Sequence, residues 1–263
     1  MGGPRPGASR GRRFGSPRRD LDVTGSTNTD ALAWAERDAP EGALVVAEHQ
    51  TAGRGRWGRR WESVPGASLL FSLVLRPQQP AGELALLTTA LGVAVAEGVD
   101  RASGLDCRLK WPNDVNASGR KLAGVLVETR LSGPTVAVAV AGVGINLDWP
   151  EVPAELAERA TSVGAELRRL GRPAAVDRAA VLGEVLYCFE QLYPAVTQSP
   201  RDVLERATGR SEILGRDVTI RLSDGSVLEG RATRLLAGGE LEVASPAGPV
   251  SVDAGEIERV RAR

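Results

Sequence analysis

Histidine and cysteine are scarce in this sequence of 263 residues, and long apolar runs are missing. His49 is the only histidine; without a second one, a metal site is disfavoured and a structural or binding-loop role is favoured. Cys107 and Cys188 have neither metal-ligand spacing nor the density of a disulfide framework, so we interpret them as buried apolar residues. No stretch is long enough to span a bilayer, and no apolar segment follows the N-terminus as in a signal peptide. We therefore expect a cytoplasmic protein without a membrane partner.

Lysine is also rare, although basic residues are not. Of the 33 basic residues only Lys110 and Lys121 are lysine, and they are balanced by 33 acidic residues. A net charge of zero predicts no polyanionic partner by itself, so any basic function must be local. Lysine is a compact charge that can lie against a phosphate or a carboxylate, which makes this pair of lysines candidates for a site.

The apolar pattern predicts an α+β fold with mixed sheets and flanking helices. Helices are expected after residues 26–28, at 80–99, 176–196 and 201–207, and strands at 44–47, 69–75, 108–111, 121–130 and 135–147. After residue 214, short β-rich runs alternate with glycine-containing turns, which is typical of a small antiparallel barrel. Residues 1–20 are rich in Gly, Pro and Arg and are interpreted as a disordered basic tail. The predicted domains are residues 21–211 and 212–263.

The segment GRGRWGRRW, residues 53–61, is the densest chemical signal. It contains the glycine spacing of a dinucleotide-binding turn, but five residues separate it from the preceding strand and no helix opens at its last glycine. The remaining interpretation is a flexible loop whose arginines can bind phosphate or carboxylate bidentately while its glycines let the backbone approach the ligand.

Three further segments carry polar or small residues at strand ends. Residues 110–115 read KWPNDV, where Pro112 stops the strand and Asn113 and Asp114 favour a turn. Residues 121–128 read KLAGVLVE and residues 142–147 read GVGINL, and glycine within a strand indicates a close backbone approach. Alone, each segment has an ordinary structural interpretation, but strand ends are also where loops build sites.

Taken together, these motifs resemble the biotin protein ligases, also called biotin–acetyl-CoA-carboxylase ligases. The order Ser-Thr-Asn from Ser26, Gln-Thr-Ala-Gly-Arg-Gly-Arg from Gln50, Trp-Pro-Asn-Asp, Lys-Leu-Ala-Gly and Gly-Ile-Asn agrees with the family through about Leu147. The resemblance implies a catalytic domain like that of class II aminoacyl-tRNA synthetases and an SH3-like C-terminal barrel. The sequence has no N-terminal winged helix, so we expect a monofunctional enzyme that does not bind DNA.

The resemblance also implies roles for individual residues. Arg54, Arg56 and Lys121 would be catalytic, because they would hold the carboxylate and the α-phosphate together. The residues implied for biotin are Ser26, Thr27, Asn28, Gln50, Gly53, Arg54, Gly55, Arg56, Lys121, Gly124 and Gly142. Those implied for ATP are Arg54, Arg56, Trp61, Asn113, Lys121 and Asn146. Asp114 would hold a magnesium ion, which takes few protein carboxylates.

The implied reaction joins biotin to ATP as biotinyl-5′-AMP, and then transfers biotin to a lysine of a biotin carboxyl carrier domain of acetyl-CoA, acyl-CoA or pyruvate carboxylase. The implied substrates and ion are biotin, ATP and Mg²⁺, and we expect a monomer or a weak homodimer. Two alternatives stay open: a lipoate-type acyl-adenylating ligase, and a non-enzymatic regulator that senses biotin or binds nucleic acid.

Overall fold

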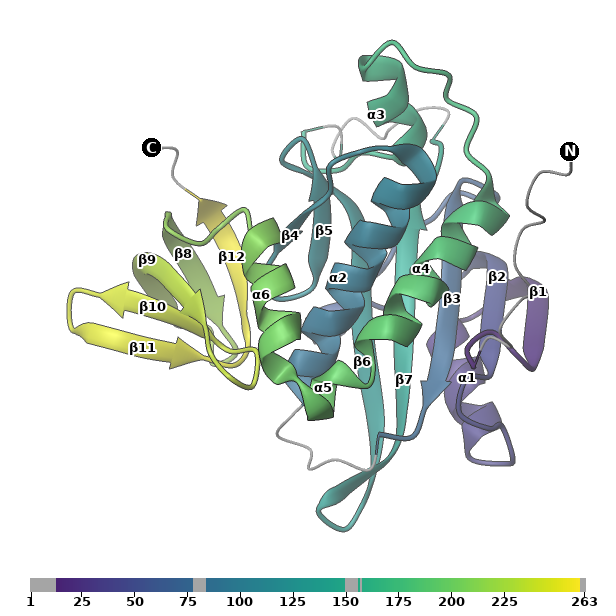
Figure 1. Cartoon of the computed structure of the whole chain (residues 1–263), viewed down its shortest axis with the longest axis horizontal. Coiled ribbons are helices and arrows are strands. Elements are labelled where there is room, and N and C mark those ends of the chain that lie inside the picture. The colour runs from purple at the N-terminus through teal and green to yellow at the C-terminus, as the bar shows by residue number, and fades with distance from the viewer. Residues whose placement is uncertain (1–12, 78–83, 150–155, 157, 261–263) are drawn as a thin grey trace, which may run out of the picture.

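The protein is built on two β-sheets, as seen in a computed structural model that describes residues 13–77, 84–149, 156 and 158–260 (Figure 1). Within those residues, the larger sheet has seven strands in the order β1-β2-β3-β7-β6-β5-β4, with a parallel β1–β2 pair and antiparallel pairs elsewhere. These strands are β1 (Arg18–Thr24), β2 (Leu44–Gln50), β3 (Ser68–Leu75), β4 (Arg108–Lys110), β5 (Asp114–Ala117), β6 (Arg120–Ser132) and β7 (Thr135–Asn146).

Both faces of the larger sheet are covered, as strand β3 illustrates. All eight of its residues are buried. Leu69, Phe71, Leu73 and Leu75 face the main core, whereas Val74, of opposite parity, belongs to a second cluster with helix α1 (Thr27–Ala35). Since side chains alternate along a strand, the same parity places Ser72 on the α1 face of the sheet.

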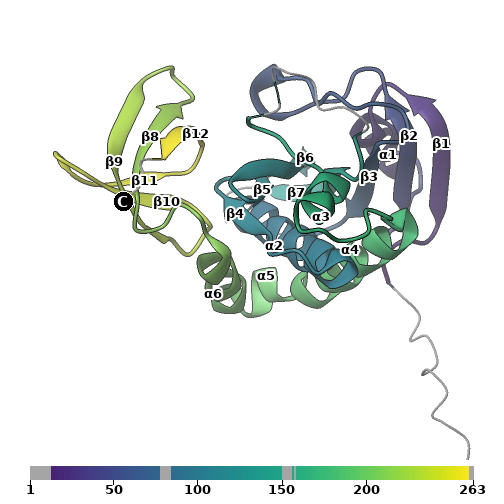
Figure 2. The same cartoon turned by 90° about the horizontal axis from the view of Figure 1, so that it is seen from above.

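Helices α2 and α4 lie side by side over one face of this sheet, and α1 lies on the other (Figures 1 and 2). Their helical periodicity buries Leu, Val and Ala against the strands. The helices other than α1 are α2 (Leu84–Ser103), α3 (Val163–Arg169), α4 (Arg178–Leu192), α5 (Ala195–Gln198) and α6 (Pro200–Arg210). A 3₁₀ turn, η1 (Arg56–Gly58), lies within the glycine-arginine loop.

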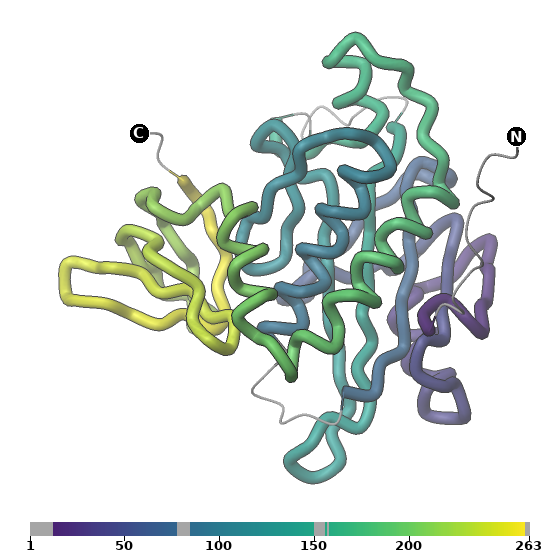
Figure 3. The backbone as a smooth tube through the Cα atoms, viewed as in Figure 1, coloured from purple at the N-terminus to yellow at the C-terminus, as the bar shows by residue number. Residues whose placement is uncertain are grey.

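The second sheet is antiparallel and, in the described residues, five-stranded, in the order β11-β10-β9-β8-β12. It has its own apolar cluster, to which Trp111 from the larger body contributes. Figure 3 shows the chain entering this sheet from helix α6. Its identification as an SH3-like barrel stays a prediction. The strands are β8 (Asp217–Leu222), β9 (Val227–Leu235), β10 (Leu241–Ser245), β11 (Gly248–Val252) and β12 (Gly255–Val260).

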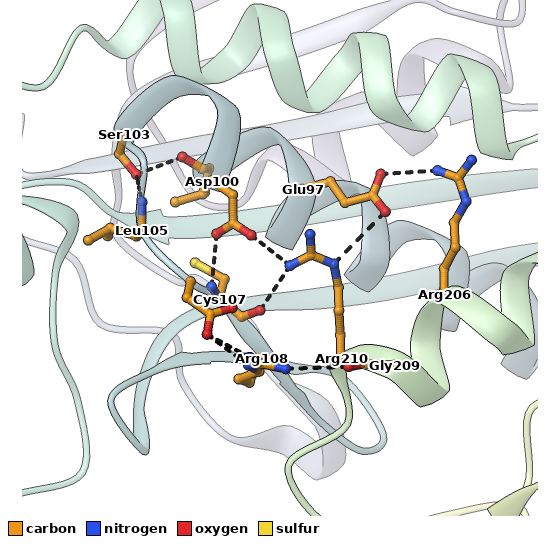
Figure 4. Close-up of polar contacts among 11 residues, drawn as sticks. Glu97, Asp100, Ser103, Leu105, Cys107, Arg108, Arg206, Gly209 and Arg210 are labelled. Carbon is orange, nitrogen blue, oxygen red and sulfur yellow. Dashed lines mark hydrogen bonds and ion pairs between the residues drawn. The ribbon is translucent and has the colours of Figure 1, made fainter.

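Ion pairs fasten α6, and hence the second sheet, to α2 (Figure 4). Arg210 Nη1 lies 2.6 Å from Asp100 Oδ2 and donates to the Cys107 carbonyl at 3.0 Å. Arg206 Nη1 lies 3.2 Å from Glu97 Oε2. Because these contacts join helices distant in sequence, they set where the chain leaves the body.

The predicted α+β class with mixed sheets is confirmed, as are most predicted elements. The pattern missed two strands: β1, which lies at the sheet edge, and the four-residue β5, which begins at the last residue of the Trp-Pro-Asn-Asp motif. It also missed helix α3, which spans only seven residues, too few for helical periodicity to emerge. The predicted helix start at Pro80 lies outside the described residues; α2 begins at Leu84.

The prediction that residues 1–20 form a disordered tail is wrong for residues 13–20. Phe14 is only 2% exposed and stacks on Phe189, with ring centroids 5.6 Å apart. The ring of Tyr193 meets that of Phe14 edge-on, with centroids 5.5 Å apart. Strand β1 begins soon after, at Arg18. A single aromatic residue among glycines and arginines gives no periodic signal, so its burial depends on partners about 175 positions away. Residues 1–12 lie outside the described part of the chain.

We expect Phe14→Ala to destabilise the protein by about 3 kcal/mol, because it leaves a cavity between two aromatic rings. Val23→Ala is the matched control: Val23 is 61% exposed, and surface truncations change stability by about 0.5 kcal/mol or less. Urea denaturation followed by circular dichroism measures both variants. Equal midpoints for the two variants would show that the N-terminal segment is not part of the folded body.

Candidate active site

One cavity of about 500 Å³ lies on the α1 face of the larger sheet, between the glycine-arginine loop and the end of the second sheet. It brings together most of the predicted site residues, although they come from six segments of the chain. Those that line it are Ser26, Thr27, Asn28, Gln50, Arg54, Gly55, Arg56, Trp61, Asn113, Asp114, Lys121, Gly124 and Gly142. Gly53 and Asn146 are the predicted residues that do not.

Glycines form the floor of the cavity, where neighbouring side chains lie close to the backbone of the sheet. Gly124 pairs with Gly144 across strands β6 and β7, and Leu126 pairs with Gly142. A Cβ atom at position 142 would overlap the amide oxygen of Asn28, and one at position 144 would lie 2.5 Å from the Trp61 ring. The absence of Cβ atoms at these positions therefore lets Asn28 and Trp61 lie directly against the strands, and Gly144 lines the cavity with them although only Gly124 and Gly142 were predicted.

A closed set of hydrogen bonds orders the polar end of the cavity at the start of α1. The Gln50 side-chain oxygen accepts from the Thr27 backbone N–H at 2.7 Å and from the Thr27 hydroxyl at 3.0 Å. Ser72 Oγ lies 2.8 Å from Thr27 Oγ1 and 2.5 Å from Asn28 Oδ1. Ser26, Thr27 and Asn28 are all buried, so these bonds fix both donors and acceptors in a site away from water.

The glycine-arginine loop folds back on itself as a small hairpin. The Trp61 N–H donates to the Gly53 carbonyl at 3.0 Å, and the Gly55 N–H donates to the Arg59 carbonyl at 2.7 Å. A Cβ atom at Gly53 would lie 2.6 Å from the Trp61 carbonyl oxygen, so Gly53 shapes the hairpin and does not line the cavity. Trp57 at the tip has φ 56°, a left-handed conformation that costs a non-glycine residue about 1 kcal/mol.

Arg54 is held on the α1 side of the cavity. Its Nη2 atom lies 2.8 Å and 3.1 Å from the two carboxylate oxygens of Glu128, and its Nη1 atom donates to Thr29 Oγ1 at 2.6 Å. Glu128 also accepts from the Asn28 side-chain amide at 2.7 Å. The loop and the polar pocket are thus joined by one carboxylate.

Arg56 and Arg59 connect the loop to the second sheet. Arg56 Nη1 donates to the Gly255 carbonyl at 3.1 Å, and Arg59 forms a two-pronged ion pair with Glu256. Burial lowers the pKa of Arg56, although the nearby carboxylates of Asp114 and Glu256 oppose that shift. No local sequence signal predicts these contacts, because they join residues almost 200 positions apart.

Lys121 projects into the middle of the cavity. Its ammonium group lies 2.6 Å from Asp114 Oδ1 and 5.6 Å from the centre of the Trp61 ring. Its backbone pairs with the segment after β7: the Lys121 N–H donates to the Arg159 carbonyl at 2.8 Å, and the Thr161 N–H donates to the Lys121 carbonyl at 2.8 Å. These two backbone hydrogen bonds hold the Lys121 backbone in place at the wall of the cavity.

Asn146 lies behind the cavity instead of lining it. Its side-chain amide donates to the Thr161 carbonyl at 3.0 Å, and its Oδ1 atom is buried without a partner among the described residues. Asn146 is therefore connected to the cavity through residues 159–161, the segment whose backbone also pairs with Lys121. The motif Gly-Ile-Asn predicted Asn146 to contact ATP directly, but Asn146 does not line the cavity, and strand parity alone does not reveal a neighbour 15 positions away.

A buried carboxylate holds that segment in place. Glu166, at the start of α3, is 1% exposed and accepts from the Thr161 hydroxyl at 2.7 Å and from Ser118 Oγ at 2.8 Å. Arg120 Nη2 lies 2.7 Å from Glu166 Oε1, and Arg169 Nε lies 2.9 Å from Glu166 Oε2, so two guanidinium groups neutralise the carboxylate. Burial alone would raise the pKa of Glu166, but these hydrogen bonds outweigh it and the pKa is lowered.

Metal ligation by a cluster of residues finds no support in the described part of the chain, where no three His, Cys, Asp or Glu side chains converge. Asp114 lines the cavity, as do Glu158 and Glu256, and the Oδ1 atom of Asn116 is buried without a partner among the described residues. His49 does not line the cavity.

None of the described helices combines the length and apolar composition needed to cross a bilayer.

The comparisons with known proteins agree with this geometry. Residues 21–146 match the model of the biotin/lipoate A/B protein ligase family. The chain is 36% identical over 258 residues to the biotin–[acetyl-CoA-carboxylase] ligase of Mycobacterium tuberculosis, which covers 94% of this chain and 91% of that protein. The chain belongs to the biotin protein ligase family.

Other relatives extend this similarity. The bifunctional ligase/repressor BirA of Bacillus subtilis is 40% identical over 174 residues, which is 65% of this chain and 52% of that protein. The chain thus spans about half the length of such bifunctional relatives. The biotin protein ligase of Aquifex aeolicus, solved in complex with biotin and ATP, superposes with a TM-score of 0.76 at 28% identity and covers 94% of this chain and 100% of that structure.

We expect Glu166→Gln to destabilise the protein by about 2 kcal/mol at pH 7, because it removes charge-assisted hydrogen bonds from a buried site. A carboxylate whose pKa is lowered on folding stabilises the protein above its unfolded pKa of about 4.3, and that stabilisation is lost as the pH falls through the lower, folded value. The difference between wild type and variant should therefore shrink below about pH 4.

Urea denaturation at pH 7, 5 and 3.5 measures this pH dependence. Glu205→Gln is the control, because Glu205 pairs with Arg201 on an exposed helix surface and should give almost no difference at any pH. A constant difference between wild type and Glu166→Gln across this range would contradict the assignment.

Proposed function

We propose that the protein is an ATP-dependent biotin protein ligase, which adenylates biotin and then transfers it to a lysine of a biotin carboxyl carrier domain. The observation that carries this proposal is the convergence of Arg54, Arg56 and Lys121 on one cavity with the polar pocket at residues 26–28. A volume of about 500 Å³ is within the range of small-molecule sites, about 300–1,000 Å³.

The polar end of the cavity suits a ring that both donates and accepts hydrogen bonds. Thr27, Asn28 and Gln50 line this end and offer hydroxyl and amide groups, which can either donate or accept hydrogen bonds. Biotin carries a ureido ring with two N–H donors and one carbonyl acceptor, whereas its valeryl chain is apolar. In this proposal the ring occupies the polar end and the chain extends over the glycine floor towards Lys121.

The cations suit a reaction between two anions. The biotin carboxylate and the triphosphate of ATP repel one another, and fixed positive charge in a water-poor cavity offsets that repulsion and stabilises the charge of the transition state. Arg54 and Arg56 would hold the carboxylate and the α-phosphate from the loop, and Lys121 would contact both from the sheet. Arg56 and Lys121 would each exchange the present partner for a ligand oxygen, whereas Arg54 would keep its contact with Glu128 and bind the ligand through its remaining N–H groups.

In the first step a carboxylate oxygen attacks the α-phosphorus, an O–P bond forms, and the bond to the β-phosphate breaks to release pyrophosphate. In the second step the neutral lysine amine of the carrier attacks the acyl carbon, AMP leaves with the electron pair of the C–O bond, and the amine proton passes to solvent. Because water hydrolyses the adenylate, a loop bound on two sides would protect it. The enzyme itself supplies no nucleophile.

ATP would extend from Lys121 towards Trp61, Asn113 and the segment behind the cavity. Asn146 does not line the cavity and would act on the nucleotide indirectly, through the Thr161 carbonyl that accepts from its side-chain Nδ2 atom. Asp114 and Asn116 supply the hard oxygen atoms that Mg²⁺ prefers, and the ion would neutralise phosphate charge. A cytoplasmic location and a monomeric or weakly dimeric state belong to the same proposal.

The direct test is transfer of labelled biotin to a purified carboxyl carrier domain, with and without ATP. We expect labelling that requires ATP and that a carrier lacking its acceptor lysine abolishes. ATP–pyrophosphate exchange with biotin, lipoate and octanoate as competing acids decides the acid: exchange driven by lipoate alone would replace this proposal by a lipoate ligase. Tight DNA binding at moderate salt without any exchange would instead indicate a regulator.

We expect Lys121→Ala and Arg56→Ala to lower the rate of biotinyl-adenylate formation by about 100- to 1,000-fold while leaving the fold intact, because each removes a charge from the α-phosphate region. Pyrophosphate release under saturating substrates measures this step. Arg130→Ala is the control, since Arg130 pairs with Glu36 on the surface and should leave the rate unchanged. Normal adenylate formation by either site variant would count decisively against the assigned roles.

A further inference from the structure

Glu128 occupies a junction that neither the sequence motifs nor the proposed reaction explains. It ends the Lys-Leu-Ala-Gly-Val-Leu-Val-Glu segment on β6 and has the same strand parity as Gly124 and Leu126, so it extends the cavity face of the sheet. Glu128 itself does not line the cavity.

Two residues that do line the cavity share its carboxylate. Asn28 Nδ2 donates to Glu128 Oε2 at 2.7 Å, and Arg54 Nη2 lies 2.8 Å from that same oxygen and 3.1 Å from Oε1. Asn28 belongs to the polar pocket on α1, whereas Arg54 belongs to the loop. Glu128 Oε2 thus contacts both the pocket that would bind the ring of the substrate acid and the arginine that would bind the carboxylate of that acid.

Stability does not account for the ion pair between Arg54 and Glu128. The two side chains are 40% and 32% exposed, and ion pairs exposed to this degree contribute little to the stability of a protein in water. The buried amide of Asn28 needs an acceptor, but Leu126 O at 3.4 Å already lies near it, and a neutral glutamine would serve as well. The negative charge at position 128 is therefore explained by Arg54.

We propose that Glu128 is a positioning residue of the adenylation site, which holds Arg54 of the loop beside the acid pocket before the reactants bind. This inference rests on the proposed function. Fixing a flexible arginine in advance removes part of the entropy lost when the reactants are aligned, and it cancels the charge of Arg54 while the site is empty. Since Asn28 shares the carboxylate, a ring bound at the pocket also stabilises the position of Arg54.

Glu128→Gln separates this role from a structural one. The glutamine carbonyl can still accept from Asn28, but it carries no charge to hold Arg54. We expect the rate constant for biotinyl-adenylate formation to fall by about 10- to 100-fold, as small misplacements of catalytic groups do, with little change in the KM for biotin or in the melting temperature. Glu128→Ala should show the same loss of rate and, because Asn28 loses its partner, a higher KM for biotin.

The decisive measurement is a double-mutant cycle with Arg54→Ala. If Glu128 acts through Arg54, Glu128→Gln should have no further effect on the adenylation rate once Arg54 is absent, whereas Glu128→Ala should still raise the KM for biotin. Glu36→Gln is the matched control: it removes a Glu–Arg pair with Arg130 on the surface, and it should change none of these quantities.

Additive effects of Glu128→Gln and Arg54→Ala, or an unchanged rate in Glu128→Gln, overturn the inference while the proposed function stands. A parallel loss of rate, KM and melting temperature in Glu128→Gln, not seen in Glu36→Gln, assigns Glu128 a structural role and also overturns it. A wild-type protein that forms no biotinyl-adenylate overturns the proposed function and this inference together.

Discussion

The arrangement of the cavity depends on electrostatic repulsion between the two anions that the proposed reaction brings together. The cations that would overcome it each have a partner in the protein. Arg54 lies against Glu128, Lys121 against Asp114, and Arg56 against the Gly255 carbonyl. Unpaired charges in a partly buried cavity would be costly, so each cation has an acceptor of its own. Ligand oxygens would replace the acceptors of Lys121 and Arg56, whereas Glu128 would keep Arg54 in place, so most of the free-energy cost of bringing the cations together arises when the protein folds.

Those acceptors also explain why the site needs parts of the chain that are far apart. The glycine-arginine loop is bound on one side by β6, through Glu128, and on the other by the start of β12, through Gly255 and Glu256. The second sheet can make the latter contacts only if it is held close, and the α2–α6 ion pairs around Arg210 provide that attachment. The C-terminal sheet is therefore part of the wall of the cavity and not an appendage to it.

Much of this was predictable from local sequence, and the failures share one cause. The motifs located the loop, the pocket residues, the floor glycines and Lys121, because each depends on residue type at a fixed spacing. Strand parity would have added Ser72 and Gly144, since both lie on the face already marked by Gly142. Phe14, Glu128 and Glu256 were missed because their roles are set by tertiary partners. Asn146 shows the same limit, since its motif did not reveal its bond to Thr161.

Selectivity for the acid, under the proposed function, depends on the polar groups that order the pocket. Thr27, Asn28, Gln50 and Ser72 hydrogen-bond one another, and the Asn28 amide also donates to Glu128. A ureido ring has N–H and C=O groups that can bond to the remaining donors and lone pairs of these residues, whereas the dithiolane ring of lipoate has neither group. Sites built to hydrogen-bond a substrate reject analogues without those groups by factors of about 10⁴ or more. Under the proposed function, the polar pocket would thus favour biotin over lipoate, independently of the arginines and lysine, which would serve either acid.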